Sequence, residues 1–490
     1  MQKEVSSEPN RGLITLHYFQ AMTRFKENES SLLPKGMTVL LPEAAARQRA
    51  IERTALSVFR LWGYQEVIPP LFEYLDVLSK GLEPELIEKS YKFVDRSNGR
   101  VMILRPDVTP QIARMVALLM AEHPKPIRLC YSANVFRYEE EHAGREREIL
   151  QIGAELIGPQ DAEADAEVIA LVVEVLKQLG LTQFRIAIGQ IGFFKGLLQA
   201  MGVPEKEHLQ IQKAVAGRDS ARLVQILEGL AFEKEQVQKI VGLLELFGQE
   251  DVFDRARRLV KTCSFPSGLG GSGAQASLDA LARLQEIYRL LKKYGLSDKL
   301  LVDLSEVRGF GYYSGMVFEV FAEGVGYELG GGGRYDHLIA QFGEDLPSTG
   351  FALHVDRLQR ALNYPLKAAD RSAVPALAAD ILLIDCGGNS GNGIRLCQML
   401  RQKGLSVIRR VTRRENIGAD LEQSRLLKVA HAILLEPIHR PKLRRPVKGA
   451  KDLDGVQAAW INYETGVKRK VKMGQLLKLA DKLSSGRHLA

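Results

Sequence analysis

The segment from Val135 to Gly158, a charged loop between two apolar stretches, constrains the fold of this chain more than any other feature. Both apolar stretches have the composition of strands, so the sequence predicts a long β-hairpin. Because side chains alternate along a strand, Gln151, Gly153 and Glu155 share one face, and Gly153 would leave a hole in it. Arg137 beside the loop and carboxylates deeper in the hairpin favour a ligand with anionic and cationic groups. A solvated charged hairpin is the alternative interpretation.

This hairpin resembles motif 2 of class II aminoacyl-tRNA synthetases, in the form found in histidyl-tRNA synthetase. The matching residues are Phe136 to Glu139, Gly144, Arg145, Arg147, Glu148, Gln151 and Glu155. Histidyl-tRNA synthetase has a non-synthetase relative, the regulatory subunit of ATP phosphoribosyltransferase. The resemblance implies an α+β fold of the class II synthetase type, with an antiparallel sheet, flanking helices, a helical insertion and a small C-terminal α/β domain.

The composition is that of a soluble globular protein with room for two or three domains, since 46% of the 490 residues are hydrophobic and 26% are charged. The four cysteines have no metal-ligand spacing, which favours free thiols in a reducing cytoplasm. No apolar run could span a bilayer, and no apolar signal core is present at the N-terminus. We therefore expect a cytoplasmic protein without a metal or cofactor.

The positive charge of the chain is concentrated near its C-terminus. From residue 401 to residue 490 there are 21 Lys+Arg and 8 Asp+Glu, a difference of +13. Residues 1–400 have 46 and 51, a difference of −5. A basic C-terminal part is typical of domains that bind nucleic acid or an acidic partner, although an ordinary solvated surface can also carry such charge.

Patterning divides the chain into a polar extension, a class II synthetase-like domain with an insertion, a linker and a C-terminal domain. The corresponding ranges are 1–31, 32–190 with 300–365, 191–299 for the mainly helical insertion, 366–379 for the linker, and 380–490. The last range resembles, in outline, an anticodon-binding domain. Near the start, Pro42 begins a predicted helix, and a strand at Tyr64–Ile68 precedes Pro69 and Pro70. This order resembles motif 1, which builds the dimer interface of the family and implies self-association.

A loop near residue 107 combines helix-start signals with a carboxylate. Thr109 could cap the apolar helix that follows, and Pro110 suits its first position. The loop with Asp107 also resembles the synthetase loop whose acidic residue and threonine hold the amino group of histidine. The family usually has a glutamate there, so this chain carries a shorter carboxylate.

Two later segments, 307–319 and 331–336, resemble the histidine-specific motifs of the family. In the family, the arginine matching Arg308 contacts the histidine carboxylate, and tyrosines matching Tyr313 and Tyr335 recognise the imidazole with a carboxylate matching Glu155. The resemblance implies a histidine-binding set of Asp107, Thr109, Arg137, Gln151, Glu155, Arg308, Tyr312, Tyr313 and Tyr335.

The second motif begins within the run Gly330 to Gly333. Four glycines cost backbone entropy and add no packing, so they indicate a place where backbone approaches a ligand or another chain closely. A flexible hairpin end is the alternative. Farther on, a glycine loop from Gly387 to Gly393 lies between a predicted strand and a predicted helix, an arrangement typical of dinucleotide-binding sites. Leu396, however, occupies the position of the third glycine of the GxGxxG motif, which argues against such a site.

The ATP half of the synthetase site is altered. Ile149 stands where the family has an aromatic ring that stacks on adenine, and His354 where a glycine leaves room for the nucleotide. Asp356 replaces a glutamate, and Gly311 replaces an acidic residue. The charged residues that remain, and keep ATP binding open, are Arg137, Glu139, Arg145 and Arg357.

These departures favour the regulatory subunit over the synthetase. The resemblance then implies a non-catalytic protein that activates the short catalytic subunit of ATP phosphoribosyltransferase and makes the first step of histidine biosynthesis sensitive to histidine. Histidyl-tRNA synthetase is the alternative, and a tRNA-binding protein without catalysis is a third interpretation.

Overall fold

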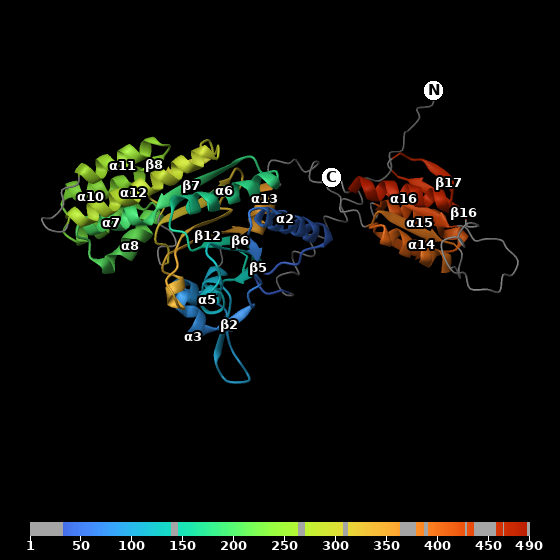
Figure 1. The fold of residues 1–490 in the computed structure, drawn as a ribbon, viewed down its shortest axis with the longest axis horizontal. Coiled ribbons are helices and arrows are strands. Elements are labelled where there is room, and N and C mark those ends of the chain that lie inside the picture. Colours follow the sequence, from blue (N-terminus) through green and yellow to red (C-terminus); the bar gives the residue numbers. More distant parts are fainter. Residues whose placement is uncertain are drawn as a thin grey trace, which may run out of the picture. The chain divides into compact units, whose positions relative to one another are not determined.

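The computed structural model describes residues 33–138, 146–262, 270–306, 312–362, 379–386, 391–426, 429–435, 457–463 and 465–487 (Figure 1). The chain forms two compact units, residues 1–366 and 367–490. The predicted N-terminal extension and nearly all of the predicted linker lie outside the described residues. Within the described residues, no helix is long and apolar enough to cross a membrane.

A nine-stranded sheet with the order β1-β5-β6-β12-β11-β10-β7-β9-β8 forms the centre of the first unit. Its strands are β1 (Gln65–Glu66), β5 (Ile127–Phe136), β6 (Glu148–Ile157), β12 (Ser348–His354), β11 (Gly330–Arg334), β10 (Met316–Ala322), β7 (Phe184–Gln190), β9 (Leu300–Asp303) and β8 (Phe247–Gly248). The predicted α+β architecture, a sheet with flanking helices, is confirmed. In the spatial order of the sheet, the neighbouring strands β5, β6, β12, β11, β10 and β7 are antiparallel as predicted. The outer pairs β1–β5 and β7–β9 are parallel, which makes the whole sheet mixed.

The predicted hairpin forms from β5 and β6, but the predicted hole at Gly153 is wrong. Tyr131 of β5 lies directly opposite Gly153 of β6. A Cβ atom on Gly153 would lie 2.5 Å from the Tyr131 hydroxyl oxygen. Glycine is needed here because the neighbouring ring occupies the space.

The glycine run is the interior strand β11, so the alternative of a flexible hairpin end is wrong. Gly330 to Gly333 pair with β10 on one side and with β12 on the other. A Cβ atom on Gly332 would overlap the carbonyl oxygen of Gly350, and one on Gly331 would overlap that of Phe318. The absence of side chains lets three strands approach closely at the middle of the sheet.

Helices α2 (Pro42–Leu61), α6 (Ala162–Gln178) and α13 (Val355–Leu362) pack on the main sheet. α2 begins at Pro42 as predicted, whereas β1 is shorter than the predicted strand Tyr64–Ile68. The side chain of Asp161 caps α6 by accepting from the Ala164 N–H at 2.9 Å. The large core of this unit includes fully buried Phe59, Ile152 and Leu156.

Helix α5 (Thr109–Leu119) begins at Thr109, but the predicted cap is wrong. The N-cap residue is Val108, and it makes no side-chain capping bond. Pro110 lies in the first turn as predicted.

A small sheet with the order β2-β4-β3 is formed by residues that precede α5 in the chain. It consists of β2 (Phe72–Tyr74), β4 (Val101–Leu104) and β3 (Lys92–Val94), with α3 (Leu75–Leu78), η1 (Ser79–Gly81) and α4 (Pro84–Glu88) along the same stretch of chain.

The segment after β7 is mainly helical, as expected. It contains α7 (Ile191–Ala200), α8 (Glu205–Ala216), α9 (Ser220–Gly229), α10 (Lys234–Val241), η2 (Gly242–Glu245), α11 (Asp251–Thr262) and α12 (Gly270–Lys293). Figure 1 shows these helices gathered at the β7 side of the main sheet. α12 packs against both α7 and α6. The short strand β8 within this segment joins the main sheet through β9, which the sequence did not indicate.

The second unit has a five-stranded sheet with the order β14-β13-β15-β16-β17, and the predicted small α/β domain is confirmed. Its elements are β13 (Ile381–Asp385), α14 (Gly391–Gln402), β14 (Val407–Val411), η5 (Arg414–Asn416), α15 (Ile417–Leu426), β15 (His431–Leu435), β16 (Gln457–Asn462), β17 (Lys468–Lys472) and α16 (Met473–Arg487). β14, β13 and β15 are parallel. Residues 387–390 of the glycine loop lie outside the described residues.

Candidate ligand-binding site

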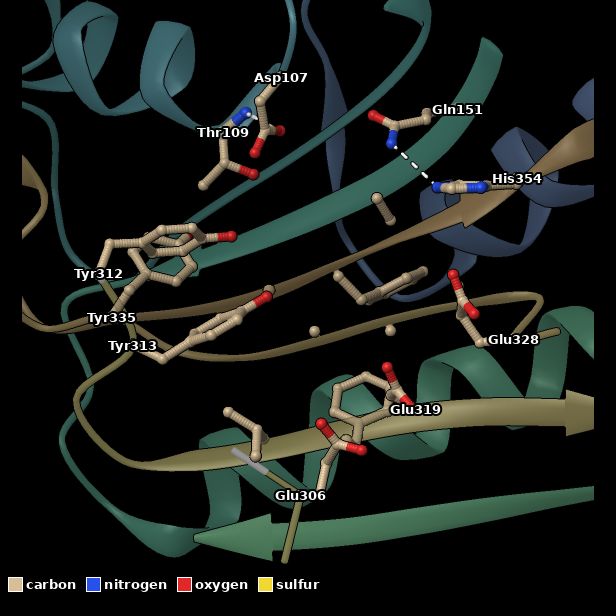
Figure 2. Close-up of a pocket in the computed structure, with 18 of the residues that line it drawn as sticks. Asp107, Thr109, Gln151, Glu306, Tyr312, Tyr313, Glu319, Glu328, Tyr335 and His354 are labelled. Carbon is tan, nitrogen blue, oxygen red and sulfur yellow. Dashed lines mark hydrogen bonds between the residues drawn. The ribbon is translucent and has the colours of Figure 1, made fainter. Parts of the chain in front are cut away.

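A cavity of about 210 Å³ lies at the glycine strand β11, between the tyrosines of the two histidine-specific motifs and the end of β12 (Figure 2). Seven of the nine predicted site residues line it, namely Asp107, Thr109, Arg137, Gln151, Tyr312, Tyr313 and Tyr335. Glu155 is not in the wall, and Arg308 lies outside the described residues. Segments separated by more than two hundred residues of sequence therefore meet in one cavity.

Glu155 is fully buried behind the cavity wall and holds two of its residues. The Thr109 hydroxyl donates to Oε1 at 2.7 Å, and the Tyr335 hydroxyl donates to Oε2. Burial raises the pKa of Glu155 to about 8, because the two hydrogen bonds only partly offset desolvation and Asp107 adds repulsion. The Thr109 hydroxyl therefore donates to Glu155, and Thr109 does not cap α5 because it is the first residue of the helix, after the N-cap residue Val108.

Three tyrosines form one end of the cavity. The ring centroids of Tyr312 and Tyr313 are 4.4 Å apart, and Tyr312 meets Tyr335 edge-on with centroids 5.8 Å apart. Burial raises the pKa of all three hydroxyls, so each is neutral at pH 7 and able to donate and accept hydrogen bonds. Such a wall suits a flat polar ring.

Asp107 and Gln151 supply hydrogen-bond acceptors to the cavity. Asp107 is 8% exposed, and burial raises its pKa while Arg137 lowers it. The Thr109 N–H donates to Asp107 Oδ1 at 3.3 Å, and the Arg137 Nε–H donates to the Pro106 carbonyl at 2.7 Å. The buried Oε1 atom of Gln151 has no hydrogen-bond partner among the described residues. A buried acceptor without a partner beside a buried carboxylate favours a ligand that donates hydrogen bonds.

His354 closes another part of the cavity. It lies opposite Gln151 in the β12–β6 pair, and the Gln151 Nε2 and His354 Nε2 atoms are 3.2 Å apart. Desolvation lowers the pKa of His354 well below its usual value, and Arg357 and Arg137 lower it further, so the ring is neutral. The imidazole occupies space that a glycine would leave open, in line with the sequence expectation.

Sequence reasoning missed three glutamates in the cavity wall, Glu306, Glu319 and Glu328. Figure 2 shows them across the cavity from Asp107 and Thr109. The guanidinium of Arg357 donates to the Glu328 carbonyl at 2.8 Å and pairs with its carboxylate. The detectable signal was Glu319, a charged residue in the otherwise apolar strand β10. With Asp107, these residues make the described wall rich in carboxylates, which favours a ligand carrying positive charge.

The cavity is equipped to hold a small polar molecule with several hydrogen-bond donors. Its carboxylates can bind an ammonium group, and its neutral tyrosine hydroxyls can accept from a ring N–H. The guanidinium of Arg137 can bind a carboxylate. Among the described residues, no group of three or more His, Cys, Asp or Glu side chains is placed to hold a metal ion.

Comparison with known proteins places this architecture in one family. The sequence profile of histidyl-tRNA synthetase matches residues 36–358. The ATP phosphoribosyltransferase regulatory subunit of Syntrophotalea carbinolica is 36% identical over 405 residues, which cover 83% of this chain and 90% of that protein.

Solved structures agree with the sequence comparison. A Bacillus halodurans protein described as an ATP phosphoribosyltransferase regulatory subunit/histidyl-tRNA synthetase has a TM-score of 0.68 and 27% identity, covering 80% of this chain and 96% of that chain. The histidyl-tRNA synthetase of Nostoc sp. PCC 7120 has a TM-score of 0.70 and covers 94% of this chain and 99% of that chain. At 20% identity, this second likeness concerns the fold alone. The chain belongs to the family of ATP phosphoribosyltransferase regulatory subunits, whose architecture is that of histidyl-tRNA synthetase.

Proposed function

We propose that this chain is a non-catalytic regulatory subunit of ATP phosphoribosyltransferase in histidine biosynthesis, and that its cavity binds L-histidine as the feedback signal. The observation that carries the ligand assignment is the juxtaposition, in one cavity, of buried Asp107, the unpartnered Oε1 of Gln151 and the three tyrosines. Histidine has an ammonium group that can donate to Asp107 and Gln151, and an imidazole N–H that can donate to a tyrosine hydroxyl.

In this proposal the ammonium of histidine lies at Asp107 and Gln151. Arg308, which the sequence predicts to meet the carboxylate, and Arg137 supply positive charge. The imidazole lies against Tyr312, Tyr313 and Tyr335. Glu155 contributes by orienting Thr109 and Tyr335, and a ring nitrogen that displaces one of these hydroxyls could reach its carboxylate directly.

The same geometry supports a binding role without adenylate chemistry. Ile149 offers no aromatic face for adenine. His354 is hydrogen-bonded to Gln151 in the space that the family keeps for the nucleotide, and Arg357 is paired with Glu328. Charged and polar groups that a nucleotide would need are thus engaged within the chain.

The proposed partner is the short catalytic subunit of ATP phosphoribosyltransferase, which the chain would activate in a cytoplasmic hetero-oligomer. The segment from α2 to β1, which resembles motif 1, is the proposed self-association region of a dimer. Binding of histidine would change the activity of the partner through a coupling free energy, typically about 1–3 kcal/mol. This coupling is what defines the chain as an allosteric regulator.

Titration calorimetry with L-histidine tests the proposal. We expect wild-type binding, and weakening by roughly 1–3 kcal/mol in Glu155→Ala and in Arg308→Ala, since each loses a polar partner of the ligand or of the wall. Gln178→Ala is a matched control, because Gln178 is exposed on α6 and hydrogen-bonded only to Glu174 in the described structure. Unaltered affinity in both test variants would place the ligand elsewhere.

A further inference from the structure

Asp165, in the first turn of α6, joins two elements that are far apart in the sequence. Its side chain is 1% exposed. The Nε of Arg334, the last residue of β11, donates to Oδ1 at 2.9 Å, and its Nη2 lies 2.8 Å from the same oxygen. From the other side, Nη2 of Arg283 on α12 lies 3.5 Å from Oδ2 and also donates to the Gln160 carbonyl. One buried carboxylate therefore holds a residue of the cavity strand and a residue of the helical segment.

Arg334 is tied to the tyrosine wall by its neighbours. It directly precedes Tyr335, whose hydroxyl donates to Glu155. Its Nη1 donates to Oδ1 of Asp336 at 3.0 Å, and the hydroxyl of Ser314 donates to Oδ2 of the same residue at 2.9 Å. Ser314 directly follows Tyr313. Two of the three tyrosines are thus one residue away from this polar network.

The network resists gradual deformation. Its ion pair is almost fully buried, with side-chain exposures of 7% for Arg334 and 1% for Asp165. A buried charge that loses its partner is costly, so the two groups must move together or exchange partners. Packed interiors respond to such demands by switching between discrete arrangements. Movement of Tyr335 by a ligand would therefore pass to Arg334, to Asp165 and then to Arg283.

We propose that Asp165 is a positioning residue that couples the cavity to α12, so that occupancy of the cavity changes the stability of the helical segment α7–α12. A partner that contacts this segment would then sense the ligand without touching it. The inference rests on the proposed function, because histidine is the ligand used to probe it. α12 is well placed for the role, since it packs against both α6 and α7.

Hydrogen exchange with and without saturating L-histidine is the first test. Asp165 is left in place, because its removal would strand the buried Arg334 charge. We expect histidine to slow exchange in α12 several-fold in the wild type. In Arg283→Gln this effect should disappear while protection of the cavity strands remains. Arg289→Gln, an exposed arginine of the same helix, is the matched control and should behave as wild type. Equal protection of α12 in Arg283→Gln, or none in a wild type that binds histidine, overturns the coupling.

A second test needs no ligand, so it also separates this inference from the proposed function. Tyr335→Phe and Arg283→Gln are combined, and the urea midpoints of the single and double variants are compared. We expect the shift of the double variant to differ from the sum of the single shifts, because the network links the two sites. Tyr335→Phe combined with Arg289→Gln should be additive. If calorimetry detects no histidine binding, the proposed function fails while this cycle still decides the coupling, and additivity in both pairs overturns it.

Discussion

Gly350 lies directly opposite Glu155 in the β12–β6 pair, and a Cβ atom on residue 350 would overlap the Oε2 atom of Glu155. The carboxylate that orients Thr109 and Tyr335 can therefore occupy its place only because its neighbour has no side chain. The position of the Glu155 side chain therefore depends on a glycine of another strand.

This relationship predicts the effect of Gly350→Ala. The added methyl group should displace Glu155, lower the free energy of unfolding by about 1–3 kcal/mol and weaken histidine binding. Urea unfolding and calorimetry measure the two effects. Gly326→Ala is the control, since a Cβ there would meet no atom within 4 Å. Equal stability of Gly350→Ala and wild type would show that the carboxylate does not need this space.

The raised pKa of Glu155 predicts a pH-dependent stability difference between wild type and Glu155→Gln. The pKa rises from 4.5 to about 8 on folding, so the folded state binds this proton more tightly than the unfolded state. This contribution is fully present below pH 4.5 and is lost as the pH rises to about 8. Relative to Glu155→Gln, wild type should lose up to about 1.4 kcal/mol per pH unit across that window. Urea unfolding of both proteins at several pH values gives the free energy of unfolding as a function of pH. If Glu155 has an ordinary pKa, this free energy will change with pH equally in wild type and in Glu155→Gln between pH 4.5 and about 8.

The altered nucleotide half predicts that the purified chain shows no histidine-dependent ATP–pyrophosphate exchange. Ile149 cannot stack on adenine, and His354 fills space next to Gln151. The exchange assay, with an active histidyl-tRNA synthetase as positive control, measures this directly. Robust exchange at ordinary enzyme concentration would support the synthetase alternative instead.

The family assignment predicts a stable complex with the short catalytic subunit of ATP phosphoribosyltransferase. Mixed at micromolar concentration, the two proteins should co-migrate in size-exclusion chromatography, and phosphoribosyl transfer should increase and become sensitive to histidine. Separate elution without a change in activity would count against the regulatory role. A tRNA-binding protein would instead shift tRNA, with a strong dependence on salt concentration.

Local signals predicted much of the fold because they depend on neighbours in the chain. Pro42 marks the start of α2, as the sequence indicates. The alternation in β5 and β6 predicts the hairpin, in which Gln151, Gly153 and Glu155 share one face. The predicted cap at Thr109 is wrong because the helix already begins at Thr109, with Val108 as the N-cap residue. The Thr109 hydroxyl instead donates to Glu155, a partner 46 residues away.

The sequence by itself determined the family, the order of the main elements and seven of the residues that line the cavity. Only the tertiary structure decided that Tyr131 fills the space at Gly153, that Glu155 lies behind the wall, and that Glu306, Glu319 and Glu328 line it. It also decided that Arg334 meets Asp165 across 169 residues of chain. The physical reason is that periodicity reports which face of an element is buried, whereas the partner on that face is chosen by strand register and by packing between distant segments.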